Sequence, residues 1–119
     1  MGLPLSPFHI EPELAMRMLL SVHFPNKEFN EAVRDGTAGE KLRQIISEAN
    51  PEAVYFIEDE GNRSVMLVVE VENSWEIPGL AEPWFLIFNA KAKFRIAMSP
   101  EDLARAGLDE LGGKWGQLR

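Results

Sequence analysis

The sequence contains no cysteine, only two histidines and a single tyrosine among its 119 residues. The absence of cysteine excludes a disulfide scaffold, thiol catalysis and thiolate metal sites. Basic residues are also few, with twelve Lys and Arg against nineteen Asp and Glu, so that the formal charge is −7. Because such a field repels phosphate, the composition disfavours binding to nucleic acid or to an anionic membrane.

Long hydrophobic runs are missing as well. The longest, such as Val65–Val69 and Trp84–Phe88, are five residues each, whereas a membrane-spanning helix needs about 20. The first residues are apolar but include Pro4, Pro7 and Pro12 and have no basic leader, so a secretory signal is not expected. Together with the absence of cysteine, this predicts a cytoplasmic protein.

With 45% hydrophobic residues, the chain has the composition of one globular domain. We expect residues 1–14 to form an extended N-terminal arm, because their prolines exclude a helix. Residues 15–119 are expected to form a single domain.

Side-chain periodicity predicts the order of the elements in this domain. Alternation of apolar and polar residues predicts strands at 16–24 and 91–98, and apolar runs on either side of the acidic turn 58–62 predict a hairpin of strands at 53–58 and 64–71. Helical spacing predicts helices within 27–49, interrupted at Asp35–Gly36, within 74–89, and from Pro100 to Gly107. Thr37 with Glu40 has the spacing of a capping box, and Ser99 has the position of a helix cap.

The order strand–helix–strand–strand–helix–strand predicts an α+β fold, the ferredoxin-like βαββαβ sandwich with a four-stranded antiparallel sheet, followed by a short C-terminal helix. We expect the first and third strands to lie in the middle of the sheet, parallel to each other. The helices should cover one face, which carries Met18, Leu20, Val22, Leu67, Val69, Phe94 and Ile96.

The opposite face of the predicted sheet is also apolar at its centre. By parity it carries Leu19, Ser21, Met66 and Val68, and either Tyr55 or its two neighbours from the second strand. Because a solvated face is seldom this apolar, we expect a second copy to cover it. Two such sheets facing each other make a dimeric α/β barrel with an enclosed pocket.

Three segments carry a resemblance to a known family: Pro51–Phe56, Ile77–Phe85 and Met98–Leu103. With them, the region from Met16 to Gly107 resembles an uncharacterised bacterial family of the dimeric α/β-barrel, ferredoxin-like superfamily. The resemblance implies the fold and the homodimer. The wider superfamily includes muconolactone isomerases and cofactor-free and haem-degrading monooxygenases, whose catalytic motifs have no counterpart in this sequence.

Six polar residues are the candidates for a ligand site on this face: His23, Tyr55, Glu70, Lys93, Arg95 and Arg17. If the central strands are parallel, His23, Glu70 and Lys93 converge at one mouth of the barrel, and Arg17 and Arg95 lie nearer its other end. A His–Glu pair beside a cation has the chemistry of a general base with an oxyanion partner. The alternative, and the more common arrangement, is a cross-strand charge network.

The remaining candidates favour structural roles. Tyr55 either points into the pocket or, more commonly for such a residue, packs in the core. Trp84 shares an apolar stripe with Phe85 and Phe88, which favours the core. No paired-histidine or calcium-loop spacing is present, so we expect no metal and no cofactor.

Two functions follow from these patterns. The first is a small-molecule-binding homodimer whose ligand is apolar or acidic, with cofactor-free isomerase-like or monooxygenase-like activity. The second is a non-enzymatic interaction module, in which the sheet face is only a dimer interface. Binding of nucleic acid on the sheet is disfavoured by the charge and by the lack of exposed aromatic pairs.

Overall fold

The computed structural model describes residues 15–117, so the predicted arm at 1–14 lies outside the described residues. The strands are β1 (Met16–His23), β2 (Ala53–Asp59), β3 (Asn62–Val71) and β4 (Lys91–Ala97). The helices are α2 (Asn26–Arg34), α3 (Ala38–Ala49), α4 (Ile77–Phe88), α5 (Pro100–Arg105) and α6 (Leu108–Trp115), with a 3₁₀ turn η2 (Ser74–Glu76) before α4. All four predicted strands are confirmed, to within two residues at each end.

The strands form one sheet in the order β2-β3-β1-β4, and every neighbouring pair is antiparallel. The prediction that the two central strands run parallel is therefore wrong: Met16 lies opposite Val71, and His23 lies opposite Ser64. The crossover through α2 and α3 makes β1 parallel to β2, and the tight hairpin then reverses β3. The result is a mixed α+β fold consistent with a ferredoxin-like arrangement.

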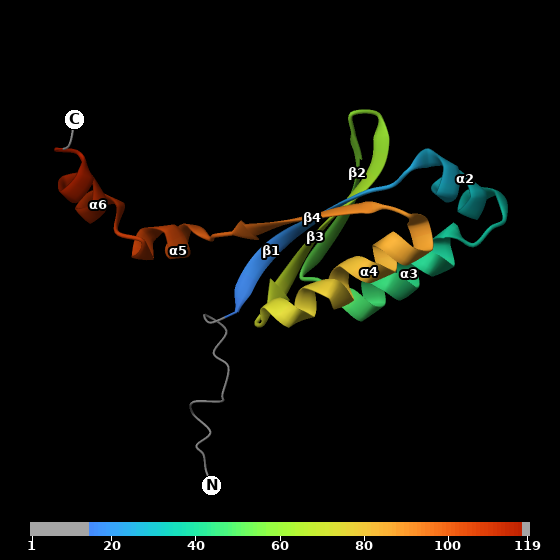
Figure 1. Cartoon of the computed structure of the whole chain (residues 1–119), viewed down its shortest axis with the longest axis horizontal. Coiled ribbons are helices and arrows are strands. Elements are labelled where there is room, and N and C mark those ends of the chain that lie inside the picture. The colour runs from blue at the N-terminus through green and yellow to red at the C-terminus, as the bar shows by residue number, and fades with distance from the viewer. Residues whose placement is uncertain (1–14, 118–119) are drawn as a thin grey trace, which may run out of the picture.

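Helices cover one face of the sheet (Figure 1), with α3 and α4 in contact with each other and α2 in contact with α3. The side chains between the helices and the sheet include Leu20, Leu67, Trp84 and Phe88, all almost fully buried. Phe24 joins this core through edge-to-face contacts with Trp84 and Phe88, at centroid distances of 5.7 and 5.2 Å. The predicted core position of Trp84 is confirmed.

One predicted core residue is not covered. Ile96 projects to the helix side of β4, opposite Met18, but its side chain is 64% exposed. Because β4 is an edge strand, no further strand flanks this side chain. The prediction that the helices bury Ile96 is therefore wrong.

Local hydrogen bonds explain where the helices begin and end. The break at Asp35–Gly36 is confirmed, but Thr37 makes no capping box: its hydroxyl donates to Asp35 Oδ1 at 2.6 Å and does not cap α3. Glu40 pairs with Arg43 instead. At the start of α5, the predicted cap is confirmed, because Ser99 and Asp102 form a reciprocal capping box.

The last two helices lie apart from the rest of the domain. In Figure 1, α5 and α6 extend away from the sheet beyond the end of β4, and neither contains a buried residue. Gly107, in the left-handed region at φ 71°, separates them. The sequence pattern predicted the first of these helices, whereas the second, α6, was not predicted.

Candidate functional site

The face of the sheet opposite the helices is uncovered within residues 15–117. We call it the open face. It carries Arg17, Leu19, Ser21 and His23 from β1; Ser64, Met66, Val68 and Glu70 from β3; Ala53, Tyr55 and Ile57 from β2; and Lys91, Lys93, Arg95 and Ala97 from β4. Leu19 and Val68 are only half-buried, although their neighbours Leu20 and Leu67 in the same strands are completely buried. This difference shows that the centre of the sheet lacks a cover on one side.

Tyr55 belongs to the open face. It lies opposite Met66, and its side chain is 66% exposed. The preferred interpretation of Tyr55 as a core residue is therefore wrong, and the alternative, a position on the pocket face, is confirmed. With Leu19, Met66 and Val68, it forms a half-exposed apolar centre.

A row of cations borders this centre along β4. Lys91, Lys93 and Arg95 alternate on the strand and lie opposite His23, Ser21 and Leu19. Arg95 Nη2 donates a hydrogen bond of 3.3 Å to Ser21 Oγ. Among residues 15–117, the ion pairs of the structure do not include these three cations. Their charge is therefore available to an anion.

His23 stands at one end of this row and pairs with a carboxylate. Its Nε2 lies 2.8 Å from Asp59 Oδ2. The cations, His23, Asp59 and Ser21 line an open hollow of about 510 Å³. A histidine oriented by a carboxylate beside a cation has the parts of a general base with electrostatic support.

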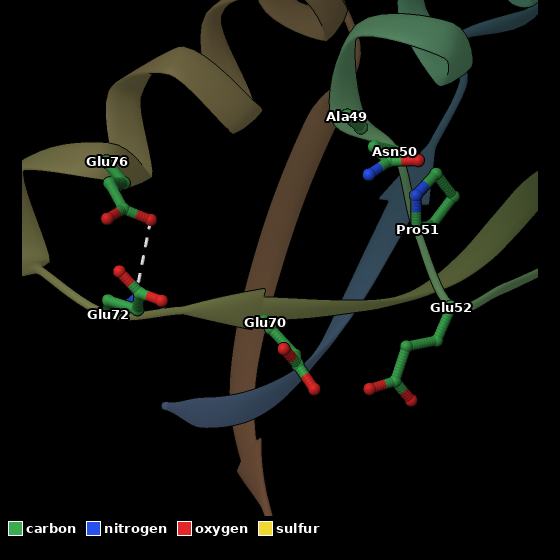
Figure 2. A pocket seen from close by; sticks show the side chains of 7 residues that line it. All are labelled: Ala49, Asn50, Pro51, Glu52, Glu70, Glu72 and Glu76. Atoms are coloured by element: carbon green, nitrogen blue, oxygen red, sulfur yellow. Dashed lines mark hydrogen bonds between the residues drawn. The ribbon is translucent and has the colours of Figure 1, made fainter. Parts of the chain in front are cut away.

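The other end of the open face is acidic. Arg17 donates two hydrogen bonds to Glu52, from Nε to Oε1 at 3.1 Å and from Nη2 to Oε2 at 3.2 Å. Figure 2 shows Glu52 and Glu70 side by side at the edge of a hollow of about 570 Å³, with Glu72 and Glu76 farther along it.

The two neighbouring carboxyl groups differ in acidity. The hydrogen bond from Arg17 is the main cause that lowers the pKa of Glu52. The hydrogen bond with Glu52 is the main cause that raises the pKa of Glu70, and desolvation of the carboxyl group and the charge of Glu52 add to it. Of these two carboxyl groups, Glu70 is therefore the weaker acid and is protonated first as the pH falls.

The six candidate residues thus divide into two groups. Lys93 lies near His23, and Arg95 lines the same hollow from a position closer to Arg17, whereas Glu70 lies opposite Arg17 at the far end of the sheet. The predicted convergence of His23 with Glu70 is wrong, because antiparallel central strands place these two residues at opposite ends. The expected positions of Arg17 and Arg95, nearer the end of the sheet away from His23, are confirmed.

Three site residues were missed by the sequence interpretation. Asp59 is the partner of His23 in place of Glu70. Glu52 pairs with Arg17, and Lys91 extends the cation row. The alternation of Lys91, Lys93 and Arg95 in the sequence is sufficient to predict that Lys91 belongs to the cation row. Nothing local in the sequence marks Asp59 or Glu52, because each pairs across the sheet.

Within the described part of the chain, no group of three or more histidine or acidic side chains is placed to hold a metal ion. None of the helices there is both long and apolar enough to cross a membrane. Comparison with protein-family models, with curated proteins and with solved structures gives no match. The family resemblance and the cytoplasmic location stay predictions.

Proposed function

We propose that this chain is a homodimeric binding protein for small ligands that carry an anionic group on an apolar body. In this proposal, the ferredoxin-like domains turn their open faces toward each other, as in a dimeric α/β barrel, and the ligand lies between them. One observation carries it: the cation row of Lys91, Lys93 and Arg95 adjoins an uncovered apolar centre.

The local charge supports an anionic ligand. Alternate residues on a strand point the same way and lie about 6.6 Å apart, so the three cations form a row about 13 Å long at the border of the open face. The whole chain carries a charge of −7. Against that background, a cation row without carboxylate partners is the one feature of the open face that attracts an anion.

The apolar centre supports both the dimer and the apolar part of the ligand. Each square ångström of apolar surface removed from water contributes about 25 cal/mol. Leu19, Met66, Val68 and Tyr55 offer this surface without any rearrangement of the sheet. A second open face or a ligand hydrocarbon gains from covering them.

His23 gives this site a chemical capacity beyond binding. Held by Asp59 at 2.8 Å, it can remove a proton from a ligand whose anionic group is fixed by Lys93. Such a step is the first half of an isomerisation and needs no cofactor. Any reaction in the site would therefore depend on His23.

A second candidate function rests on a different surface. Leu108, Leu111 and Trp115 on α6 are 58%, 44% and 56% exposed, which is typical of a segment that contacts another protein. This observation favours an interaction module, with the open face as its dimer interface and no ligand between the copies.

Native mass spectrometry and titration with octanoate test the first proposal. We expect a dimer that binds octanoate but not 1-octanol, which has the same chain without the charge. Lys93→Glu should weaken octanoate binding about tenfold or more, because it reverses a charge in the row. Lys27→Glu, which makes the same change on the exposed side of α2, is the matched control and should bind octanoate like the wild type.

Two results would contradict the proposal. A monomer at micromolar concentration would remove the shared pocket. Equal binding of octanoate and 1-octanol, or unchanged binding after Lys93→Glu, would show that the cation row does not hold the ligand.

A further inference from the structure

The C-terminal arm, residues 98–117, is built from helices too short to be stable alone. Helix α5 has six residues and α6 has eight, and isolated helices below about 12 residues are marginal in water. Figure 1 shows both extending from the end of β4 away from the helical layer, and the start of α5 lies near the sheet only at a hollow that it shares with Arg17 and Glu70. Their own domain therefore gives them little packing, and a cover from outside would stabilise them.

The arm carries a stripe suited to such a cover. Leu108, Leu111 and Trp115 are spaced by three and four residues, so they share one face of α6. Met98 and Leu103, which are 62% and 42% exposed, continue the apolar surface back towards β4. This much exposed apolar surface on one extended segment is typical of a docking element.

We propose that the arm docks on a second copy of this chain, where α6 packs against the β4 side of the partner's open face. This inference rests on the open face of the proposed function being available to a second copy. It adds that each copy contributes a helix to the site of the other.

Charge complementarity favours the open face of the partner as the surface on which α6 docks. Asp109 and Glu110 lie in the first turn of α6, next to the apolar stripe. The open face presents an apolar centre bordered by Lys91, Lys93 and Arg95, which is the matching combination. Two acids facing three cations leave the site with a net positive charge, so that an anionic ligand is still attracted.

The path of the chain prevents the arm from covering its own cation row. β4 runs from Lys91 to Ala97, so the arm leaves the sheet at the end farther from Lys91. The capping box of Ser99 and Asp102 starts α5 directly afterwards, and Figure 1 shows that α5 continues outward from β4. The cation row within reach of the arm is therefore that of another molecule.

Cross-linking with a carbodiimide tests this contact in the full chain, because the reagent joins a carboxyl group directly to an amine. Equal amounts of ¹⁴N-labelled and ¹⁵N-labelled protein are mixed, cross-linked and digested. We expect cross-linked peptides of mixed isotope that join Asp109 or Glu110 to Lys91 or Lys93. Cross-links of a single isotope only, or none, would overturn the proposal.

The double variant Leu111→Glu, Trp115→Glu provides an independent measurement by sedimentation equilibrium. It should weaken dimer association about tenfold or more, because both changes place a charge on the docking stripe. Leu86→Glu, on α4 and 79% exposed, is the matched control and should associate like the wild type. Unchanged association of the double variant would overturn the proposal.

Charge exchange and octanoate titration complete the test. Glu110→Lys and Lys93→Glu should each weaken association, and the combined variant should recover part of it; no recovery would count against this contact. Octanoate binding that survives without mixed cross-links would overturn arm docking and leave the proposed function standing. Mixed cross-links without binding of octanoate would overturn the proposed ligand and leave arm docking standing.

Discussion

Arg17 holds Glu52 through two nearly parallel hydrogen bonds of 3.1 and 3.2 Å. Arg17 is in β1 and Glu52 directly precedes β2, two strands that are separated by β3. The pair therefore bridges β3, and it does so beside Glu70, which lies opposite Arg17 in the sheet. One cation thus serves two neighbouring carboxyl groups.

Glu70→Gln should stabilise the protein at pH 7. The pKa of Glu70 is raised in the folded state, and for such an acid the favourable contribution to stability is lost as the pH rises through the folded pKa. The amide of the variant can still donate a hydrogen bond to Glu52, but it does not ionise. Between pH 4 and pH 7 the wild type should therefore lose stability relative to the Glu70→Gln variant. Thermal unfolding at both pH values measures this. Glu82→Gln, which removes one carboxylate on the exposed side of α4, is the matched control.

Arg17→Met should have the opposite consequence in the acid range. Arg17 lowers the pKa of Glu52, and a carboxylate with a lowered pKa contributes stability that is lost as the pH falls through its folded pKa. Arg17→Met should be less stable than the wild type at pH 7, and this difference should shrink as the pH falls below the ordinary glutamate value of 4.5. If the difference is the same at pH 7 and pH 3, the pair does not contribute as described.

Much of the fold could be predicted because its signals are local. The alternation in β1 and the spacing around Trp84 each follow from a short stretch of sequence. The direction of β3 relative to β1 depends instead on the path of the whole crossover, and that prediction was wrong. Thr37 shows that local spacing does not always predict a helix cap. Its hydroxyl donates to Asp35 instead, so the residues with the spacing of a capping box form no cap.

The candidate site could be predicted only where it follows one strand. The basic residues Lys93 and Arg95 alternate, and their shared face follows from parity alone. The partners of His23 and Arg17 come from distant segments, so Asp59 and Glu52 are fixed by sheet register, which the sequence pattern does not contain. The face that Tyr55 occupies could not be predicted without the sheet register either, because only its pairing with Met66 shows this face.

Trp84→Ala should be strongly destabilising, because its side chain is completely buried in the aromatic core. Large-to-small core changes of this kind cost about 3–5 kcal/mol. Urea unfolding followed by circular dichroism measures the free energy of unfolding. Trp75→Ala is the matched control: Trp75 is 75% exposed, and its replacement should change the free energy by less than about 0.5 kcal/mol.

Two glycines should respond to alanine with opposite signs. Gly61, in the β2–β3 turn, has φ of 80°, and an alanine there would cost about 1 kcal/mol because the left-handed region disfavours a Cβ. Gly39 is in the first turn of α3, and nothing lies within 4 Å of an added Cβ, so Gly39→Ala should stabilise by less than about 1 kcal/mol. Urea midpoints that shift the same way for both variants would contradict this account.

The neighbours Val68 and Val69 separate folding from association. Val69 is 1% exposed beneath the helices, so Val69→Lys would bury an unpaired charge and should abolish the cooperative fold. Val68 is half-buried at the centre of the open face. Val68→Lys should therefore keep the circular dichroism spectrum and cooperative unfolding of the domain, while weakening its self-association about tenfold or more. Light scattering across a dilution series measures the second property. A folded Val68→Lys variant that associates like the wild type would show that the copies meet elsewhere, and loss of folding would show that the open face is covered within the chain itself.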